Sequence, residues 1–296
     1  MEVLQRRALT LEPISEADIA GVARFLHEQL NAKVSIDRWA AAMRAPWQVD
    51  PPNHGFCLRD GDAIVGAYLA LYSERTLNGK RERFCNLAAW CVLENHRTGS
   101  IRLLKALLAQ EGYTFTDFSP SGNVVPLNRR LGFESLDTST AIVANLPWLS
   151  LPWPKLPGRE RTVVEPDELR AILKGDDLEI FDRLADAPAA LHIALTRGER
   201  YCYTVVRRER RKGLAVFASL LYVSSPEVLQ RRWRAFAGHL LVRHGIVATL
   251  AELRIVGQRP CPSRLLETPR HKMFRSATLR AEDIDYLYSE LVALPW

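Results

Sequence analysis

Polar side chains that could carry acid–base chemistry interrupt two otherwise apolar runs of this chain. Asn86 lies within the run from Phe84 to Leu93, and Asp117 lies within the run TFTDF. A carboxylate in a buried strand must be paired or lie at the end of the sheet, and there it can accept a proton. Glu82 is a second candidate base, whereas Asn86 could orient a water molecule or a substrate. A structural role is the alternative for each.

The loop after the second run adds hydroxyl and amide groups. Ser119, Ser121 and Asn123 lie in the string SPSGN, where they could orient a thiolate or a water molecule. The same residue types are ordinary in turns, because their short side chains bond to the nearby backbone, so both interpretations stay open. The histidines have no spacing typical of a catalytic triad or a metal site, and we expect no metal.

A basic turn containing a glycine, Arg97-Thr98-Gly99-Ser100, connects the first apolar run to a segment with helical spacing. The apolar residues of that segment recur every three or four positions, at Ile101, Leu104, Leu107 and Leu108. The positive end of a helix dipole and the N–H groups of the first turn attract anions, and a glycine lets the backbone approach a ligand. The sequence therefore predicts an anion site at this helix N-terminus.

This order of strand, basic turn, helix and strand resembles the core of the GNAT superfamily of acyl-CoA-dependent N-acetyltransferases. The family pattern in the turn is Arg/Gln-x-x-Gly-x-Gly/Ala. Arg97 matches its first position, whereas Ser100 and Arg102 replace its first glycine and its last small residue. Leu131-Gly132-Phe133 resembles the Gly-Phe signature that closes the family core. The preceding chain also has the family's order of elements: a strand at 9–14, helices at 15–30 and 35–44, and two hairpin strands.

The resemblance implies that acyl-CoA, most simply acetyl-CoA, lies between a strand at 84–93 and a strand at 113–118. Its pyrophosphate would bind the basic turn. Arg102 could either block that turn or bind phosphate through its guanidinium. The residues that we expect to contact the acyl-CoA are Trp90, Cys91, Val92, Leu93, Arg97, Thr98, Gly99, Ser100, Ile101, Arg102, Asn123 and Asn128.

Many members of the family have a tyrosine four residues before the closing glycine, which protonates the leaving thiolate. This chain has Asn128 there, and an amide is no general acid, so that role is vacant or filled elsewhere. The resemblance implies direct attack of a primary amine, of a small molecule or a peptide, on the thioester. The catalytic candidates are Asp117, Glu82, Asn86, Ser119 and Asn123. A non-catalytic CoA-binding or regulatory module is the alternative, favoured by Asn128 and the altered turn.

The length of 296 residues and the hydrophobic content of 47% are typical of a globular protein with two domains. We expect a first domain over 1–145, a Pro- and Trp-rich linker over 146–158, and a second domain over 159–296. The order of elements begins again after the linker, which favours a second, degenerate GNAT-like repeat. The expected fold is α/β, with two tandem domains that each contain a mixed, mostly antiparallel sheet flanked by helices.

Only the first half is expected to bind CoA, because the second turn, Val223 to Pro226, has no glycine and its proline lacks an N–H group. Two strings in the second half, PRHKMFR at 269–275 and DIDYLYSEL at 283–291, could face the substrate or attach that half to the first.

The net charge of +6 comes from the second half, chiefly from the runs at 207–212 and 231–234. No recognition motif accompanies these runs, so we expect solvated surfaces rather than a nucleic-acid site, although a transferase acting on RNA stays open. The five cysteines have no CxxC spacing, which predicts reduced, buried thiols. The chain shows no apolar run of roughly 20 residues and no signal peptide, so we expect a cytoplasmic protein without membrane spans.

Overall fold

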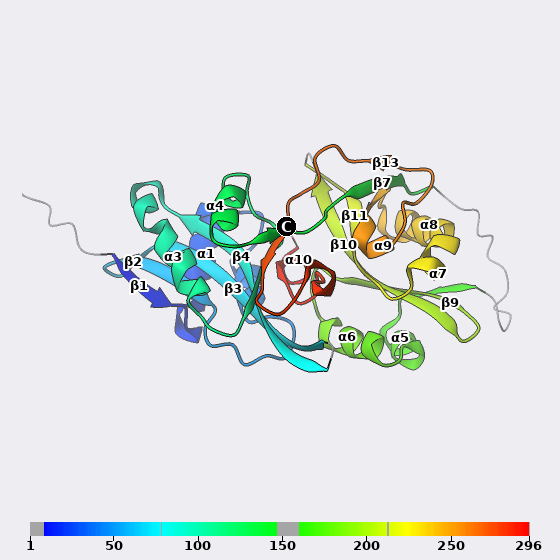
Figure 1. The fold of residues 1–296 in the computed structure, drawn as a ribbon, viewed down its shortest axis with the longest axis horizontal. Coiled ribbons are helices and arrows are strands. Elements are labelled where there is room, and N and C mark those ends of the chain that lie inside the picture. The colour runs from blue at the N-terminus through cyan, green and yellow to red at the C-terminus, as the bar shows by residue number, and fades with distance from the viewer. Residues whose placement is uncertain (1–8, 78, 147–159, 212, 296) are drawn as a thin grey trace, which may run out of the picture. The chain divides into compact units, whose positions relative to one another are not determined.

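The computed structural model describes residues 9–77, 79–146, 160–211 and 213–295. The described chain forms two seven-stranded sheets, both mixed and both accompanied by helices (Figure 1). This architecture confirms the fold class predicted from the sequence. The linker predicted at 146–158 lies outside the described residues, apart from Leu146.

The first sheet has the strand order β1-β2-β3-β4-β5-β14-β6. Its strands are β1 (Thr10–Pro13), β2 (Gly55–Asp60), β3 (Ala63–Leu77), β4 (Lys80–Val92), β5 (Thr114–Asp117), β14 (Met273–Arg275) and β6 (Glu134–Ser135). Only β4 and β5 are parallel. A parallel pair needs a crossover connection, formed here by the 3-10 helix η2 (Glu94–Gly99) and the helix α3 (Ser100–Leu108).

The helical spacing in α3 buries one face of that helix against the parallel pair. Leu103, Leu104 and Leu107 are fully buried and belong to the same core cluster as Cys85 of β4 and Phe115 of β5. Burial of three leucine side chains stabilises this crossover by several kcal/mol, at about 1.5–3 kcal/mol each. The remaining helices of this part are α1 (Ile19–Gln29), α2 (Ile36–Met43), α4 (Val124–Arg130) and α10 (Glu290–Ala293).

The second sheet has the order β13-β7-β12-β11-β10-β9-β8, with β11 and β12 parallel. Its strands are β13 (Arg264–Leu265), β7 (Thr140–Ala144), β12 (Ala248–Glu252), β11 (Leu214–Val223), β10 (Arg200–Arg211), β9 (Leu191–Arg197) and β8 (Arg161–Val163). Its helices are α5 (Pro166–Ile172), α6 (Asp176–Leu184), α7 (Pro226–Arg231), α8 (Trp233–His244) and α9 (Leu253–Val256).

Two elements of the second half end where their apolar patterns continue. The helical segment over 226–244 is broken at Arg232, whose φ of −113° and ψ of 14° are not helical. The apolar segment over 246–255 is a strand only as far as Glu252, because α9 begins at the next residue. Arg207 and Glu209 are also buried rather than solvated. The apolar pattern predicted the core of these elements but not the points where they end.

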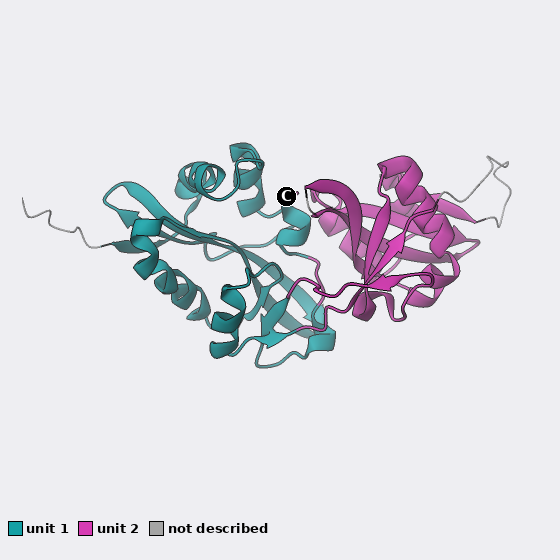
Figure 2. Cartoon of the chain, turned by 90° about the horizontal axis from the view of Figure 1, so that it is seen from above, with its two compact units in different colours: residues 1–135, 272–284, 288–294 teal, residues 136–271, 285–287, 295–296 magenta. Residues whose placement is uncertain are grey.

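Each sheet contains one strand that comes from a distant part of the sequence. In the first sheet β14 lies between β5 and β6, and in the second sheet β7 lies between β12 and β13. The compact units are therefore discontinuous: residues up to 135 with 272–284 and 288–294, and residues 136–271 with 285–287 and 295–296 (Figure 2). The domains predicted at 1–145 and 159–296 are continuous, whereas these units are not, because β7 bonds to β12 and β14 bonds to β5.

The position of β14 in the first sheet predicts that the first unit depends on residues near the C-terminus. Phe274 of β14 is 1% exposed and pairs in register with Thr116 of β5. Phe274→Ala should destabilise the first unit by about 3–5 kcal/mol, because it removes a buried ring. Hydrogen exchange should become faster in β5 and β6. The matched variant Val143→Ala, in β7, should instead affect β12. If Phe274→Ala instead made hydrogen exchange faster in β12, the pairing of β14 with the first sheet would be contradicted.

Candidate active site

The parallel pair in the first unit ends early. Residues 84–86 of β4 pair with residues 114–116 of β5. Beyond Asn86, β4 continues to Val92 and is bonded on one edge to β3, while no described strand lies against its other edge. The N–H and C=O groups of residues 87–92 on that side, which we call the open edge of β4, are therefore not used by the sheet.

A buried polar cluster lies where β5 ends. Asp117, the last residue of β5, is 3% exposed, and its carboxylate accepts hydrogen bonds from Asn128 Nδ2 at 2.9 Å and from the Ser119 backbone N–H at 3.3 Å. Glu290 is fully buried, and its Oε1 accepts from the Ser119 hydroxyl at 2.8 Å. Ser119 thus donates to both carboxylates. We call this group the Asp117–Glu290 cluster.

The environment of Asp117 changes its acidity. Burial, and then the negative charge of Glu290, raise the pKa of the Asp117 carboxyl to about 7, while the hydrogen bonds from Asn128 and Ser119 act in the opposite direction. A carboxyl group that titrates near neutral pH can both accept and release a proton under ordinary conditions. The cluster therefore has the property that a general base requires.

Two of the other predicted catalytic residues have different surroundings. Asn86 lies beside the cluster, but its Nδ2 donates to Thr116 Oγ1 at 3.1 Å and its Oδ1 accepts from the Glu290 N–H at 2.9 Å. Both ends of its amide therefore tie β4, β5 and α10 together. Glu82 lies about 16 Å along β4 from the level of Asp117, at roughly 3.3 Å per residue, and its carboxylate accepts from the Thr278 hydroxyl.

The loop residues also separate into two groups. Ser119 belongs to the Asp117–Glu290 cluster. Ser121 and Asn123 are exposed, and Asn123 makes no capping bond although it stands at the N-terminus of α4. The structure thus brings Asp117, Asn86, Ser119 and Asn128 together, and it does not bring Glu82 to them.

The basic turn is helical rather than open. Glu94–Gly99 is a 3-10 helix, and the Ser100 N–H donates to the Arg97 carbonyl. Because N–H groups within a helix are bonded internally, this turn does not present the row of free N–H groups expected at 97–102. The Arg97 guanidinium pairs with Glu94 at 2.7 Å, and Arg102 donates to the Leu9 carbonyl at 3.0 Å.

Gly99 has a packing role that differs from the expected one. Its φ of −80° is ordinary, and a Cβ added there would lie 3.0 Å from Leu58 Cδ1 and 3.3 Å from Leu9 Cδ1. The glycine therefore allows the turn to pack closely on β2. The expectation that it opens the backbone toward a ligand is not supported by this geometry.

The residues expected to contact acyl-CoA beside the cluster follow the open edge. Trp90, Cys91, Val92 and Leu93 are all half-buried. The Trp90 ring stacks on Tyr68 of β3, with ring centroids 4.6 Å apart. Within the described residues, Trp90 Nε1 and Asn128 Oδ1 are buried atoms without a hydrogen-bond partner, so one donor and one acceptor near the open edge are unsatisfied.

Two residues near this cluster were not singled out from the sequence, although the string at 283–291 that contains Glu290 was expected either to face the substrate or to attach the second half. The Tyr68 hydroxyl lies close enough to the cluster that, after burial, the Asp117 charge is the next cause raising the pKa of this phenol well above its usual value. Glu290 reaches the site from the string at 283–291, more than 150 residues along the chain. The sequence signal for Glu290 is a carboxylate within an apolar run, LYSELVAL at 287–294. The same kind of signal singled out Asp117.

The second unit lacks the central carboxylate. Pairing between β11 and β12 ends at Ser219 and Leu250, so Ala251 stands where the first unit has Asp117. The Ser219 hydroxyl donates to Glu209 at 3.0 Å. The helix that follows β11, α7, has six residues and begins with Pro226. The two sheets share a strand order but differ at this position, and the buried carboxylate at the end of β12 is Glu252, which accepts a hydrogen bond from the Tyr286 hydroxyl.

Solved structures share the architecture of this chain. A GCN5-related N-acetyltransferase of Anabaena variabilis has a TM-score of 0.56 at 13% identity, over 90% of this chain and 72% of that one. One of Kribbella flavida has a TM-score of 0.55 at 13% identity, over 91% and 71%. A third structure, from Pyrococcus horikoshii, has a TM-score of 0.54 at 14% identity, over 99% and 98%. The chain has the fold of the GCN5-related N-acetyltransferases.

Sequence comparison adds nothing to this assignment, since no family model and no curated protein matches the chain. At these identities the likeness concerns the GCN5-related fold, and function must be argued from the site. The described residues contain no group of three or more His, Cys, Asp or Glu side chains that could hold a metal ion. None of the described helices has the length and apolar character needed to cross a bilayer, and all five cysteines are free.

The raised pKa of Asp117 predicts how stability depends on pH. The folded state holds the proton up to about pH 7, whereas the unfolded state releases it near the ordinary value of 3.8. Stability should therefore fall as pH rises between these values. Relative to Asp117→Asn, which cannot ionise, the free energy of unfolding should fall by about 3 kcal/mol between pH 5 and pH 8. Urea unfolding measures this, and equal pH dependence in both proteins would refute the raised pKa.

Proposed function

We propose that the first unit is an N-acyltransferase that moves an acyl group, most simply acetyl, from acyl-CoA to a primary amine. The observation that carries this proposal is the Asp117–Glu290 cluster at the end of β5, beside the open edge of β4. An amine must lose a proton as it attacks a thioester. A buried carboxyl with a pKa near 7, in a fold whose solved examples include acetyltransferases, can accept that proton.

The acyl-CoA would bind along the open edge of β4. Its pantetheine amides would bond to backbone groups of residues 87–92, with Trp90 Nε1 and Asn128 Oδ1 as further partners. Its pyrophosphate would bind Arg97, which would exchange Glu94 for a phosphate oxygen. That exchange costs little, because the Arg97–Glu94 pair is exposed to solvent and such pairs contribute about 0–1 kcal/mol.

The reaction follows from these positions. The amine nitrogen attacks the thioester carbonyl carbon, and the resulting ammonium gives its proton to Asp117. The tetrahedral intermediate then collapses, the C–S bond breaks, and the CoA thiolate leaves. The thiolate takes its proton from solvent, because burial and the Asp117 charge raise the pKa of Tyr68 and make its phenol too weak an acid to replace the missing acid at Asn128. The acceptor can be a small amine, an amino sugar, a peptide N-terminus or a lysine.

We infer that the second unit is a related repeat without this activity. Its sheet has the same succession of strands, which supports a tandem origin. Ala251 in place of Asp117 and Pro226 at the start of α7 support the loss of catalysis and of CoA binding.

A non-catalytic acyl-CoA-binding module is the second candidate. Two observations favour it: Asn128 at the position of the usual acid, and the helical turn whose N–H groups are bonded internally. Binding without turnover would distinguish it from the transferase.

Calorimetric titration with acetyl-CoA, followed by thiol release with a panel of amines, tests the transferase. We expect one site per chain and turnover with at least one amine. Asp117→Asn should lower kcat/KM by about 100-fold or more with acetyl-CoA affinity unchanged, because proton transfer contributes roughly that factor. The rate of the unmodified protein should rise with pH through about 7 as Asp117 ionises.

Asp182→Ser is the control variant and should leave kcat/KM unchanged, because Asp182 is an exposed residue of the second unit. Binding with no turnover of any amine would favour the non-catalytic module. Turnover that Asp117→Asn leaves intact would remove this residue from the reaction.

The phosphate contact gives an independent prediction. Arg97→Gln should weaken acetyl-CoA binding by about tenfold, because it removes a charge-assisted contact worth roughly 1.4 kcal/mol. Glu94→Gln should strengthen binding, because it frees Arg97 from its partner. Calorimetry measures the acetyl-CoA affinity of both variants, and the proposal requires weaker binding by Arg97→Gln and tighter binding by Glu94→Gln. No change in either variant would place the pyrophosphate elsewhere.

A further inference from the structure

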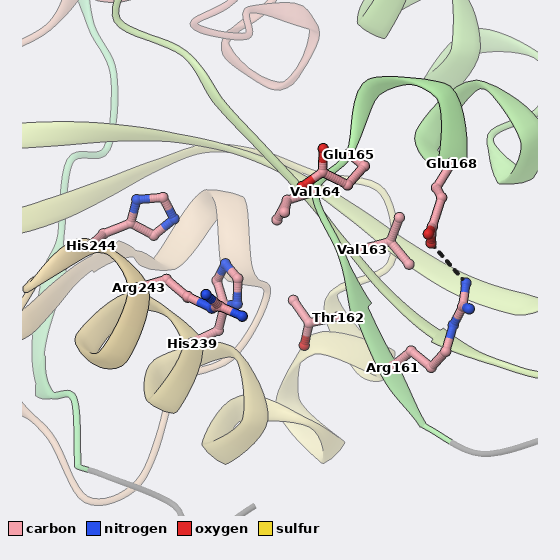
Figure 3. A pocket seen from close by; sticks show the side chains of 9 residues that line it. All are labelled: Arg161, Thr162, Val163, Val164, Glu165, Glu168, His239, Arg243 and His244. Carbon is pink, nitrogen blue, oxygen red and sulfur yellow. Dashed lines mark hydrogen bonds and ion pairs between the residues drawn. The ribbon is translucent and has the colours of Figure 1, made fainter. Parts of the chain in front are cut away.

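A cavity of about 660 Å³ lies within the second unit. One wall is β8 with Val164, Glu165 and Glu168, and the other is the end of α8 with His239, Arg243 and His244 (Figure 3). This volume falls in the range of about 300–1,000 Å³ that is typical of small-molecule sites. None of its lining residues belongs to the proposed transferase site.

The charges on the two walls differ. Arg161 of β8 pairs with Glu168 of α5 at 3.1 Å, so these two largely cancel, and Glu165 adds a negative charge beside them. Arg243 supplies the positive charge on the α8 wall, and the described residues include no ion pair for it. A guanidinium that no carboxylate neutralises at the mouth of a cavity is suited to an oxyanion.

Two histidine side chains line the same wall of the cavity as Arg243. His239 and His244 lie with ring centroids 5.4 Å apart. His239 Nε2 is buried and finds no hydrogen-bond partner among the described residues. An unpaired buried nitrogen is unfavourable, and a ligand atom in the cavity would remove that penalty.

The electrostatic environment of the imidazoles indicates the sign of the ligand. Burial, and then the positive charges of His244 and Arg243, lower the pKa of His239 to about 4. Burial, Arg208 and Arg243 likewise lower the pKa of His244. Since both pKa values are lowered, the two rings are uncharged near neutral pH, and Arg243 and Arg208 give the α8 wall its positive potential. An anion would offset that potential and favour protonation of both rings.

We propose that this cavity binds a small ligand through an oxyanion group, a phosphate or a carboxylate, held by Arg243 and by N–H groups of His239 and His244. Glu165 on the opposite wall repels the anion and confines it to the α8 side. The proposal does not depend on the transferase activity of the first unit.

Calorimetric titration of the full chain with sulfate and, separately, with acetate tests this site. Sulfate represents a phosphate group and keeps its charge between about pH 5 and pH 8, so any pH dependence reports on the protein. We expect saturable binding of at least one probe, and the tighter one identifies the ligand group. Binding should tighten as pH falls, because the anion raises the pKa of the imidazoles and binding takes up protons.

Three variants make the test specific. Arg243→Gln should weaken binding about tenfold, and Glu165→Gln should strengthen it, because one removes attraction and the other removes repulsion. Arg231→Gln, an exposed arginine of α7 outside the cavity, is the matched control and should have no effect. His239→Asn should reduce the pH dependence.

The proposal is overturned if neither probe binds saturably at millimolar concentrations, or if Arg231→Gln weakens binding as much as Arg243→Gln does. It is equally overturned if Glu165→Gln has no effect, because the anion would then lie outside this cavity.

Discussion

The first unit depends on the burial of two carboxylates at the end of one short parallel strand. Asp117 and Glu290 are at most 3% exposed, and both accept hydrogen bonds from Ser119. Burying like charges close together is unfavourable unless one group is protonated, and the raised pKa of Asp117 expresses that constraint. The same constraint provides a proton acceptor near neutral pH. We therefore regard the chemistry of the site as a consequence of how β5 ends.

The surrounding elements hold the two carboxylates in place. The pairing of β4 with β5 stops at Asn86, and the Asn86 amide then bonds to both Thr116 and the Glu290 N–H. β14 supplies the other neighbour of β5 from a distant part of the sequence. The C-terminal residues thus complete both the sheet and the cluster. Because of this, the compact units do not coincide with the two halves of the sequence.

Sequence patterns predicted the fold and singled out Asp117 of the candidate site. The apolar run with Asn86, the helical leucines of α3 and the carboxylate in β5 gave the strand–helix–strand core and singled out Asp117, because burial of apolar faces is a local property of sequence. The strand exchange was not predictable, since the apolar patterns of β7 and β14 fit either sheet. Glu290 and Tyr68 were not singled out, because their elements reach the cluster only through tertiary pairing.

The basic turn shows a different limit. Arg97 and Gly99 fitted an anion site by residue type, but the turn is helical, Gly99 packs on Leu58, and Arg97 pairs with Glu94. Residue types in a turn specify which interactions are available, and the neighbouring strands and charges decide which of them form. In the second unit, the same strand order carries Ala251 at the position of Asp117, so the two units differ in the residue on which the proposed chemistry depends.

The central claim is that acyl-CoA binds along the open edge of β4 next to Asp117. Hydrogen exchange with and without acetyl-CoA tests it most directly, since exchange reports protection of individual backbone segments. The account predicts added protection at residues 87–93 and none at residues 220–223, the corresponding stretch of β11. Unchanged exchange at 87–93, or protection in β11 instead, would contradict it.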